Sequence, residues 1–260
     1  MHERVKVITI LMNDAIQNKI HIDKMWGLFI GRFNDNILHR HYALQIGVSS
    51  QAQFEITDEN NDPKFYKTCF INSNIRHRFE SKEISLIILI NPISNIGHQL
   101  YNKYHHTQIT NMDAELKGIT DIFNTFLKDR ISFAELIEQI SFLLTDFKCN
   151  IELERHFTDD RIYKAIQYLE KHFDRIVSLE EIASFCFLSE TRFLHLFKEK
   201  TNLNFRRYQL WNKLIKSLPY LKTHSITETA HQFGFTDSSH YCRTFKETFG
   251  LTPKFISLLD

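Results

Sequence analysis

Two short segments of the chain carry polar side chains that could bind nucleic acid. Arginine can form a two-pronged hydrogen bond to guanine, hydroxyl and imidazole groups can bind several base edges, and lysine neutralises phosphate. In both segments the apolar residues recur at the i, i+3 or i+4 spacing of an amphipathic helix, which leaves the polar residues on the exposed face. The candidate residues are Thr191, Arg192, Leu194, His195 and Lys198 in the first segment, and Ser239, His240, Cys242, Arg243 and Lys246 in the second.

Each segment is the second half of a pattern that occurs twice in the sequence. Residues 178–201 align with residues 225–249, with matching residues at one offset before a turn and at an offset one residue larger after it. A repeat of this length predicts two copies of one structural unit. In each copy we expect a short helix, a turn and a second helix, which is the helix-turn-helix arrangement.

The first helix of each copy has a predicted start. Ser178 is followed by Glu181, and Ser225 by Glu228, at the spacing of a capping box. In that motif the serine side chain accepts a hydrogen bond from the third helical amide, and the glutamate reaches back to the amide of the cap. Both first helices are therefore predicted to begin with a reciprocal pair of hydrogen bonds.

The turns and the connection between the copies are also predicted. Gly234 can take the positive φ that ends a helix, whereas the first copy has Phe187 near that place and must turn without glycine. The apolar residues of residues 205–218 predict one linker helix, and Pro219 is expected to kink or end it in its last turn. If the two second helices enter successive major grooves, they must lie about 34 Å apart.

Residues 160–258 resemble the AraC/XylS family of transcriptional regulators. The most specific part is residues 226–253, ITETAHQFGFTDSSHYCRTFKETFGLTP, which follow the family signature almost position by position. The resemblance implies two helix-turn-helix units joined by a linker helix that bind double-stranded promoter DNA in a sequence-specific way. RNA polymerase is then an expected partner. The base-reading positions of the family correspond here to Thr191, Leu194, His195, Ser239, His240, Cys242 and Arg243.

The N-terminal part of the sequence predicts a β-rich domain. Short apolar runs separated by turns predict a small barrel or sandwich. The segment looks like a degenerate cupin, the barrel that many AraC-type regulators carry ahead of the DNA-binding half. The fold class is therefore α+β, with a cupin-like barrel followed by an all-helical domain. The predicted strands are residues 5–12, 25–33, 41–49, 54–57, 65–71, 77–80 and 84–90.

Several residues of this domain are candidates for a binding site. In metal-binding cupins the ligands would map onto His39, His41, Gln45 and His77, but the usual glutamate is Gln45 here. The favoured interpretation is that the histidines pack or hydrogen-bond within the barrel, so no metal and no cofactor is assigned. The other role for the barrel is to hold a small-molecule effector. The candidate ligand-binding residues are Trp26, Phe29, His39, His41, Gln45 and His77.

Helical periodicity predicts a hairpin after the barrel. Residues 119–127 and 133–147 each have an apolar stripe. Such a hairpin can cover the barrel or pair with a second subunit, and the resemblance favours a homodimer. The predicted organisation is a sensing and dimerisation domain over residues 1–148, a linker over residues 149–159 and a DNA-binding domain over residues 160–260.

Composition fits two domains and excludes several classes of protein. Of the 32 Lys+Arg and 31 Asp+Glu residues, 15 and 11 lie in residues 160–260, a charge of +4, which leaves 17 and 20, or −3, for the rest. The four cysteines have neither zinc-ligand nor disulfide spacing, which fits a reducing cytoplasm. No apolar run is long enough to cross a membrane, so no membrane partner is expected.

The leading hypothesis is thus a cytoplasmic, effector-responsive transcriptional regulator that is not an enzyme. The alternative is a metal-dependent cupin enzyme with an accessory DNA-binding domain.

Overall fold

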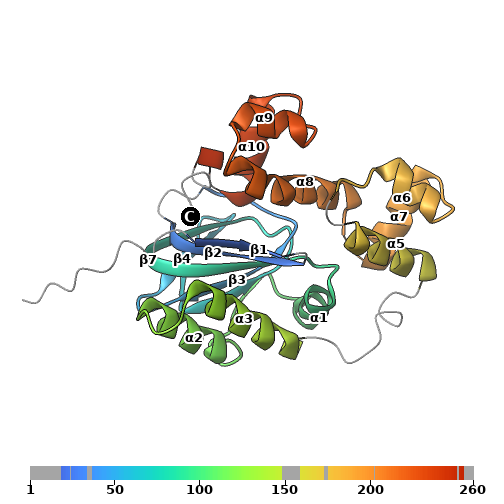
Figure 1. The fold of residues 1–260 in the computed structure, drawn as a ribbon. Helices are drawn as coiled ribbons and strands as arrows, with labels where there is room; N and C mark the ends of the chain where they lie inside the picture. The colour runs from blue at the N-terminus through green and yellow to red at the C-terminus, as the bar shows by residue number, and fades with distance from the viewer. Residues whose placement is uncertain are drawn as a thin grey trace, which may run out of the picture.

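The computed structural model describes residues 19–23, 25–33, 37–147, 159–172, 175–201, 203–250 and 252–254. Its N-terminal half is built on an antiparallel sheet, and its C-terminal half consists of helices (Figure 1). The predicted α+β class is therefore confirmed. The strand predicted at residues 5–12, and all of the predicted linker except Asp159, lie outside the described residues.

One long strand organises the sheet. The strand β7 has 14 residues and pairs with β2, β3 and β4. Residues 77–80 and 84–90 were predicted as separate strands, but the chain runs through both without a break because each half has its own pairing partners. The strands are β1 (Lys19–Ile22), β2 (Trp26–Phe33), β3 (Leu44–Ser49), β4 (Phe54–Asp58), β5 (Pro63–Tyr66), β6 (Thr68–Ile71), β7 (His77–Ile90) and β8 (Ile109–Asn111).

The sheet is cupin-like but open. Its order is β1-β2-β7-β3-β6-β8, with β4 paired to β7 on one side and β5 on the other. Among the described strands, β1 pairs with β2 and β8 with β6, so these pairings do not close the sheet into the predicted barrel. The N-terminal domain is better described as a curved sheet whose faces are covered by helices.

The first face of the sheet is covered by the predicted helical hairpin. Successive side chains of a strand point to opposite faces, so Leu28 and Ile30 of β2 share one apolar cluster. Helices α2 (Lys117–Leu127) and α3 (Phe133–Leu144) contribute to that cluster, and α1 (Asn95–Tyr104) lies at its edge. A 3-10 turn, η2 (Thr145–Phe147), follows α3. Figure 1 shows α2 and α3 under the sheet.

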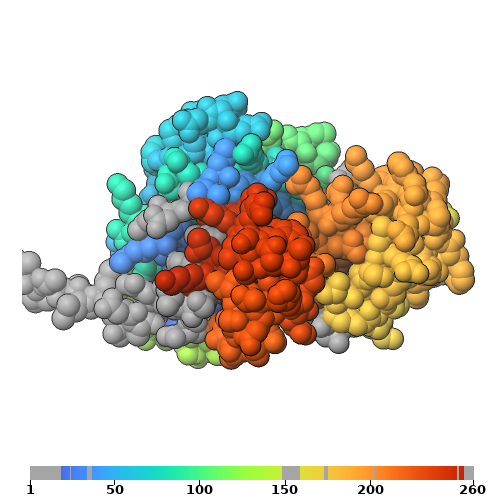
Figure 2. Space-filling model, turned by 90° about the horizontal axis from the view of Figure 1, so that it is seen from above, coloured from blue at the N-terminus to red at the C-terminus, as the bar shows by residue number. Residues whose placement is uncertain are grey.

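The C-terminal half contains the two predicted helix-turn-helix units. The first unit and its supporting helix lie at one end of the long helix α8, and the second unit lies at the other end (Figure 1). In the space-filling view both units lie on the surface turned to the viewer, the first in yellow and orange and the second in red (Figure 2). The helices are α5 (Asp160–Lys171), α6 (Leu179–Phe185), α7 (Glu190–Thr201), α8 (Phe205–Leu221), α9 (Ile226–Gln232) and α10 (Ser238–Phe249).

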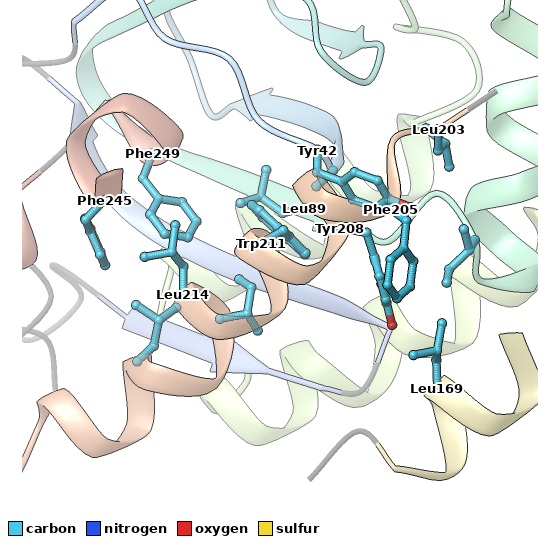
Figure 3. Close-up of a cluster of buried hydrophobic side chains, with 14 of the residues drawn as sticks. Tyr42, Leu89, Leu169, Leu203, Phe205, Tyr208, Trp211, Leu214, Phe245 and Phe249 are labelled. Carbon is cyan, nitrogen blue, oxygen red and sulfur yellow. The ribbon is translucent and has the colours of Figure 1, made fainter. Parts of the chain in front are cut away.

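The second face of the sheet packs against α8 and α10. Tyr42 contacts Tyr208 of α8 with ring centroids 5.4 Å apart, and Phe29 contacts Phe249 of α10 at 6.4 Å. Figure 3 shows Tyr42, Tyr208, Trp211 and Phe249 in the space between sheet and helices. The two halves of the chain thus share one buried cluster.

Among the described residues, no helix combines the length and apolar character needed to span a bilayer.

Candidate DNA-binding helices and the buried histidine cluster

The first unit exposes one face of α7. The hydroxyl of Ser178 accepts from the amide of Glu181 at 3.0 Å, which fixes where α6 begins. Ala183 of α6 and Phe193 of α7 are buried where the two helices meet. Because Phe193, Leu196 and Phe197 form the buried stripe of α7, its remaining residues face outward.

The two units differ in how their first helix is capped. In the second unit the amide of Ser225 donates to the Glu228 carboxylate at 2.9 Å, and the Glu228 amide donates to Ser225 at 3.2 Å. The reciprocal box predicted there is confirmed. In the first unit the prediction was wrong, because Glu181 turns away to accept from Arg175 at 2.8 Å and from Tyr168 at 2.5 Å. Charge-assisted bonds to a guanidinium are stronger than a bond to a neutral amide.

This ion pair predicts an acid-sensitive first unit. The hydrogen bonds from Arg175, and then from Tyr168, lower the pKa of Glu181 from 4.5 to about 2. Because the pKa of Glu181 is lower in the folded chain than in the unfolded chain, its ionised carboxylate stabilises the fold at pH values above the unfolded pKa. That stabilisation is lost as the pH falls from about 4.5 towards 2. We expect Glu181→Gln to make the free energy of unfolding less dependent on pH in this window, as measured by urea titrations at several pH values. Glu180→Gln, the exposed neighbour, is the control and should leave the dependence unchanged.

The turns of the two units have the same geometry but different residues. Phe187 has φ 55° and Gly234 has φ 69°. The amide that follows each of them donates across its turn at 2.9 Å, from Leu188 to Ala183 and from Phe235 to the equivalent alanine of α9. The left-handed conformation predicted for Gly234 is confirmed. Phe187 adopts it too, although a side chain makes this conformation unfavourable.

Replacing Phe187 with glycine should therefore stabilise the first unit. The left-handed conformation costs a residue with a side chain roughly 1–2 kcal/mol. Glycine loses roughly 0.5–1 kcal/mol through its greater freedom in the unfolded chain. The Phe187 side chain is 96% exposed and so loses little packing when removed. A gain of up to about 1 kcal/mol is expected in urea unfolding. Ser184→Gly, at an exposed helical position, should instead destabilise by about 0.5 kcal/mol. Equal effects of both changes would contradict this expectation.

The ten predicted contact residues lie on α7 and α10. Eight of them are exposed, whereas Leu194 and Cys242 are half-buried. Leu194 packs against the apolar cluster of the unit, so less of its surface is available to a partner. The side chain of Asp237 caps α10 by accepting from the His240 amide at 2.7 Å. The exposed set is Thr191, Arg192, His195 and Lys198 on α7, and Ser239, His240, Arg243 and Lys246 on α10.

The linker helix α8 holds both units. It has 17 residues and a length of about 25 Å at 1.5 Å per residue. The ammonium of Lys213 donates to the carbonyl of Gly234 at 3.2 Å, and that of Lys216 donates to the carbonyl of Arg175. Pro219 lies in the last turn of this helix, which ends at Leu221, so its missing amide affects the end of α8 alone.

Comparisons with known proteins find similar transcriptional regulators. A family model described as a helix-turn-helix domain matches residues 182–256. The probable transcriptional regulator LumQ of Photobacterium leiognathi is 21% identical over 223 residues, which cover 83% of this chain and 88% of LumQ. The transcriptional activator RhaS of Escherichia fergusonii is 36% identical over 99 residues, covering 37% of this chain and 36% of RhaS.

The C-terminal part of the chain is similar to transcriptional regulators of the AraC/XylS family. The chain is a DNA-binding transcriptional regulator of the AraC type. Its fold resembles that of ToxT from Vibrio cholerae, with a TM-score of 0.59 at 12% identity over 92% of this chain and 99% of ToxT. A second ToxT structure, described as bound to an unsaturated fatty acid, has a TM-score of 0.53 at 15% identity over 92% of this chain and 97% of ToxT.

In this AraC-type regulator the predicted ligand-binding residues divide into two groups. Trp26 belongs to the cluster beneath the sheet, whereas Phe29 belongs to the cluster that faces α8 and α10. The crevice that both residues line has a volume of about 20 Å³, enough for little more than a water molecule. The other four residues lie together elsewhere in the domain.

His39, His41 and His77 form a compact buried cluster. Their ring centroids are 4.5 to 5.6 Å apart. His39 and His77 sit opposite each other in an isolated β-bridge, with reciprocal backbone hydrogen bonds of 2.9 Å. Burial lowers the pKa of His39 to about 3 and also lowers the pKa values of His41 and His77. The three imidazoles are therefore neutral at physiological pH.

A second feature of the sheet domain was not predicted. A hollow of about 250 Å³ lies between the segment after His39 and the helices α8 and α10. Arg40 from the sheet domain and Arg207 from α8 both line it. Burial, and then the nearby charge of Arg40, lower the pKa of Arg207. The two guanidiniums are far apart in the sequence, so no local pattern could have paired them.

Proposed function

We propose that this regulator binds promoter DNA through α7 and α10 and that a small molecule held by its sheet domain controls that binding. The observation that carries the proposal is the position of α8. One helix fixes both helix-turn-helix units through Lys213 and Lys216, and the same helix packs on the sheet through Tyr208 and Trp211. A change at the sheet can therefore reach both units.

In this proposal the exposed residues of α7 and α10 divide into two roles. Arg243 makes a two-pronged contact with guanine, and the hydroxyl and imidazole groups around it bind other base edges. Lys198 and Lys246 bind phosphates and contribute affinity without sequence preference. The two helices occupy successive major grooves, about 34 Å apart.

The hollow between the halves is the proposed effector site. Its two guanidiniums, Arg40 and Arg207, outnumber the carboxylate of Glu247 and favour an anionic group. Leu210 and Trp211 favour an apolar body. A small amphipathic carboxylate has both an anionic group and an apolar body. The unsaturated fatty acid in the ToxT structure supports this ligand class. Because the lining comes from both halves, a bound molecule would change how they pack.

The remaining assignments rest on the resemblance and on the names of the relatives. We place the sensing domain at residues 1–148, the linker at residues 149–159 and the DNA-binding domain at residues 160–260. The relatives are named regulators, which supports a cytoplasmic, non-enzymatic role with RNA polymerase as a partner. The homodimer surface is placed on the helical hairpin because of the resemblance, and Phe142 of α3 lies exposed on that hairpin.

Selection from a random double-stranded DNA library tests the function. The full chain should enrich a common motif, and a competition assay should favour that motif over a scrambled version at several salt concentrations. Enrichment of no motif, with equal binding to both sequences, would contradict sequence-specific regulation. Repeating the assay with a medium-chain carboxylate, for the wild type and for Arg207→Ala, tests the effector. The ligand should shift DNA affinity in the wild type alone.

A further inference from the structure

We infer that His39, His41 and His77, with Gln45 as a fourth ligand, form a binding site for one divalent transition-metal ion. One ring nitrogen from each of the three histidines lies within 4.8 Å of the other two, and all three residues are buried. Four ligands at about 2.0–2.1 Å around a tetrahedral zinc lie about 3.3 Å from each other. The cluster thus needs a contraction that small side-chain rotations can supply.

The Nδ1 nitrogen of each histidine ring is already held by a backbone carbonyl. The Nδ1 atoms of His39 and His41 lie 2.8 Å from the carbonyls of Ile37 and Ala43, and that of His77 lies 3.0 Å from a carbonyl two residues earlier. A carbonyl accepts, so each Nδ1 carries the proton and each Nε2 has a free lone pair. Histidines that bind metals are held in this way, with the far nitrogen donating to a backbone or carboxylate oxygen.

Two polar atoms of the cluster lack the partners that burial requires. Among the described residues, His77 Nε2 and Gln45 Nε2 have no hydrogen-bond partner. In addition, Gln45 Oε1 lies 2.9 Å from His41 Nε2. Because the His41 proton is on Nδ1, this contact brings two lone pairs together. Rotating the Gln45 amide would satisfy His41 but would leave His77 Nε2 without a partner. A metal ion would accept the lone pairs of His41 Nε2, His77 Nε2 and Gln45 Oε1 together, whereas Gln45 Nε2 is a donor and gains no partner from it.

The donor set indicates the class of metal. Three neutral imidazoles and one amide oxygen favour zinc, cobalt, nickel or copper over magnesium and calcium, which prefer carboxylate and water oxygens. Entry is possible because His41 also lines the 250 Å³ hollow between the halves. The His41 ring lies 6.1 Å from Trp211 of α8, so metal binding would stiffen the segment on which α8 packs. This consequence rests on the proposed sensing function, whereas the site itself does not.

Metal titration of the 260-residue chain tests the site. After chelator treatment, the wild type should bind one equivalent of Co(II) with a ligand-field absorption spectrum, and Zn(II) should displace it and raise the midpoint of thermal unfolding. His77→Gln should weaken binding at least ten-fold. His98→Gln, which changes a buried histidine of α1 outside the cluster, should bind as the wild type does. The reference chain, called the wild type here, and all variants carry asparagine at His105 and His106, an adjacent exposed pair that could bind metal adventitiously.

Less than one equivalent in the wild type, or equal affinity in His77→Gln, would overturn the site. If His77→Gln fails to fold, Gln45→Glu and Gln45→Leu decide, because a carboxylate should tighten binding and an aliphatic side chain should weaken it. Equal affinities in those two variants would also overturn it. DNA binding is measured on the same preparations, so a metal-loaded chain without sequence preference would count against the proposed function and not against the site.

Discussion

Replacing Trp211 with alanine is expected to lower the free energy of unfolding by about 3–5 kcal/mol, the usual cost of removing a buried tryptophan. Trp211 is 5% exposed and lies between the two halves of the chain. Its ring contacts His41 of the sheet domain at 6.1 Å and Phe249 of α10 at 5.4 Å. Removing the indole would leave a cavity at the contact that joins the linker helix to the sheet (Figure 3).

Urea unfolding followed by two probes measures this effect. Circular dichroism reports the helices, and tyrosine fluorescence or near-ultraviolet dichroism reports tertiary packing. Leu210→Ala is the control, since Leu210 is the neighbouring residue of α8 and is 37% exposed. It should cost less than about 1 kcal/mol. If the two variants lost similar stability, Trp211 would not anchor the halves together. Separate transitions in Trp211→Ala would show that the halves had become independent.

The helical half of the fold was predictable because its determinants are local. The serine caps and the spacing of Phe193 and Phe197 act within one or two turns of helix. The repeat shows the same pattern of caps and apolar residues a second time, which strengthens the prediction. The linker helix was predicted from the helical spacing of its apolar residues. Gly234 also encodes its own turn, since glycine takes positive φ at little cost.

The features that were mispredicted depend on residues far apart in the sequence. Glu181 left its expected partner because the fold brings Arg175 and Tyr168 within reach. The predicted barrel stayed open because strand closure depends on pairing between distant segments, which strand periodicity does not encode. Trp26 and Phe29 are three residues apart in a strand, and an odd separation places two side chains on opposite faces of the sheet.

The DNA-binding faces, the histidine cluster and the hollow between the halves differ in how far the sequence could predict them. The exposed faces of α7 and α10 follow from helical periodicity, so the sequence was enough to assign them. The histidines were grouped by the resemblance, but the orientation of His77 and its unpaired Nε2 required the fold. The hollow between Arg40 and Arg207 had no sequence signal, because its walls come from two domains.

Replacing Arg243 with alanine is expected to weaken binding to the selected DNA motif by about 1–3 kcal/mol, roughly 5- to 150-fold, and to remove the preference for one base. Arg243 is exposed on α10, on the face opposite the buried Tyr241 and Phe245. Its removal therefore changes little in the packing of the second unit. The loss should come from a guanine contact that no other base reproduces.

Lys246→Ala, one turn further along the same exposed face, separates base recognition from phosphate binding. It should weaken binding to the motif and to scrambled DNA alike and should reduce the salt dependence of affinity, because a lysine–phosphate contact has no sequence preference. Binding constants for both DNAs and for the three substitutions at the affected base pair measure the difference. If Arg243→Ala behaved like Lys246→Ala, with discrimination unchanged, Arg243 would bind phosphate, and base recognition by the second unit would have to come from Ser239 and His240 at the start of α10.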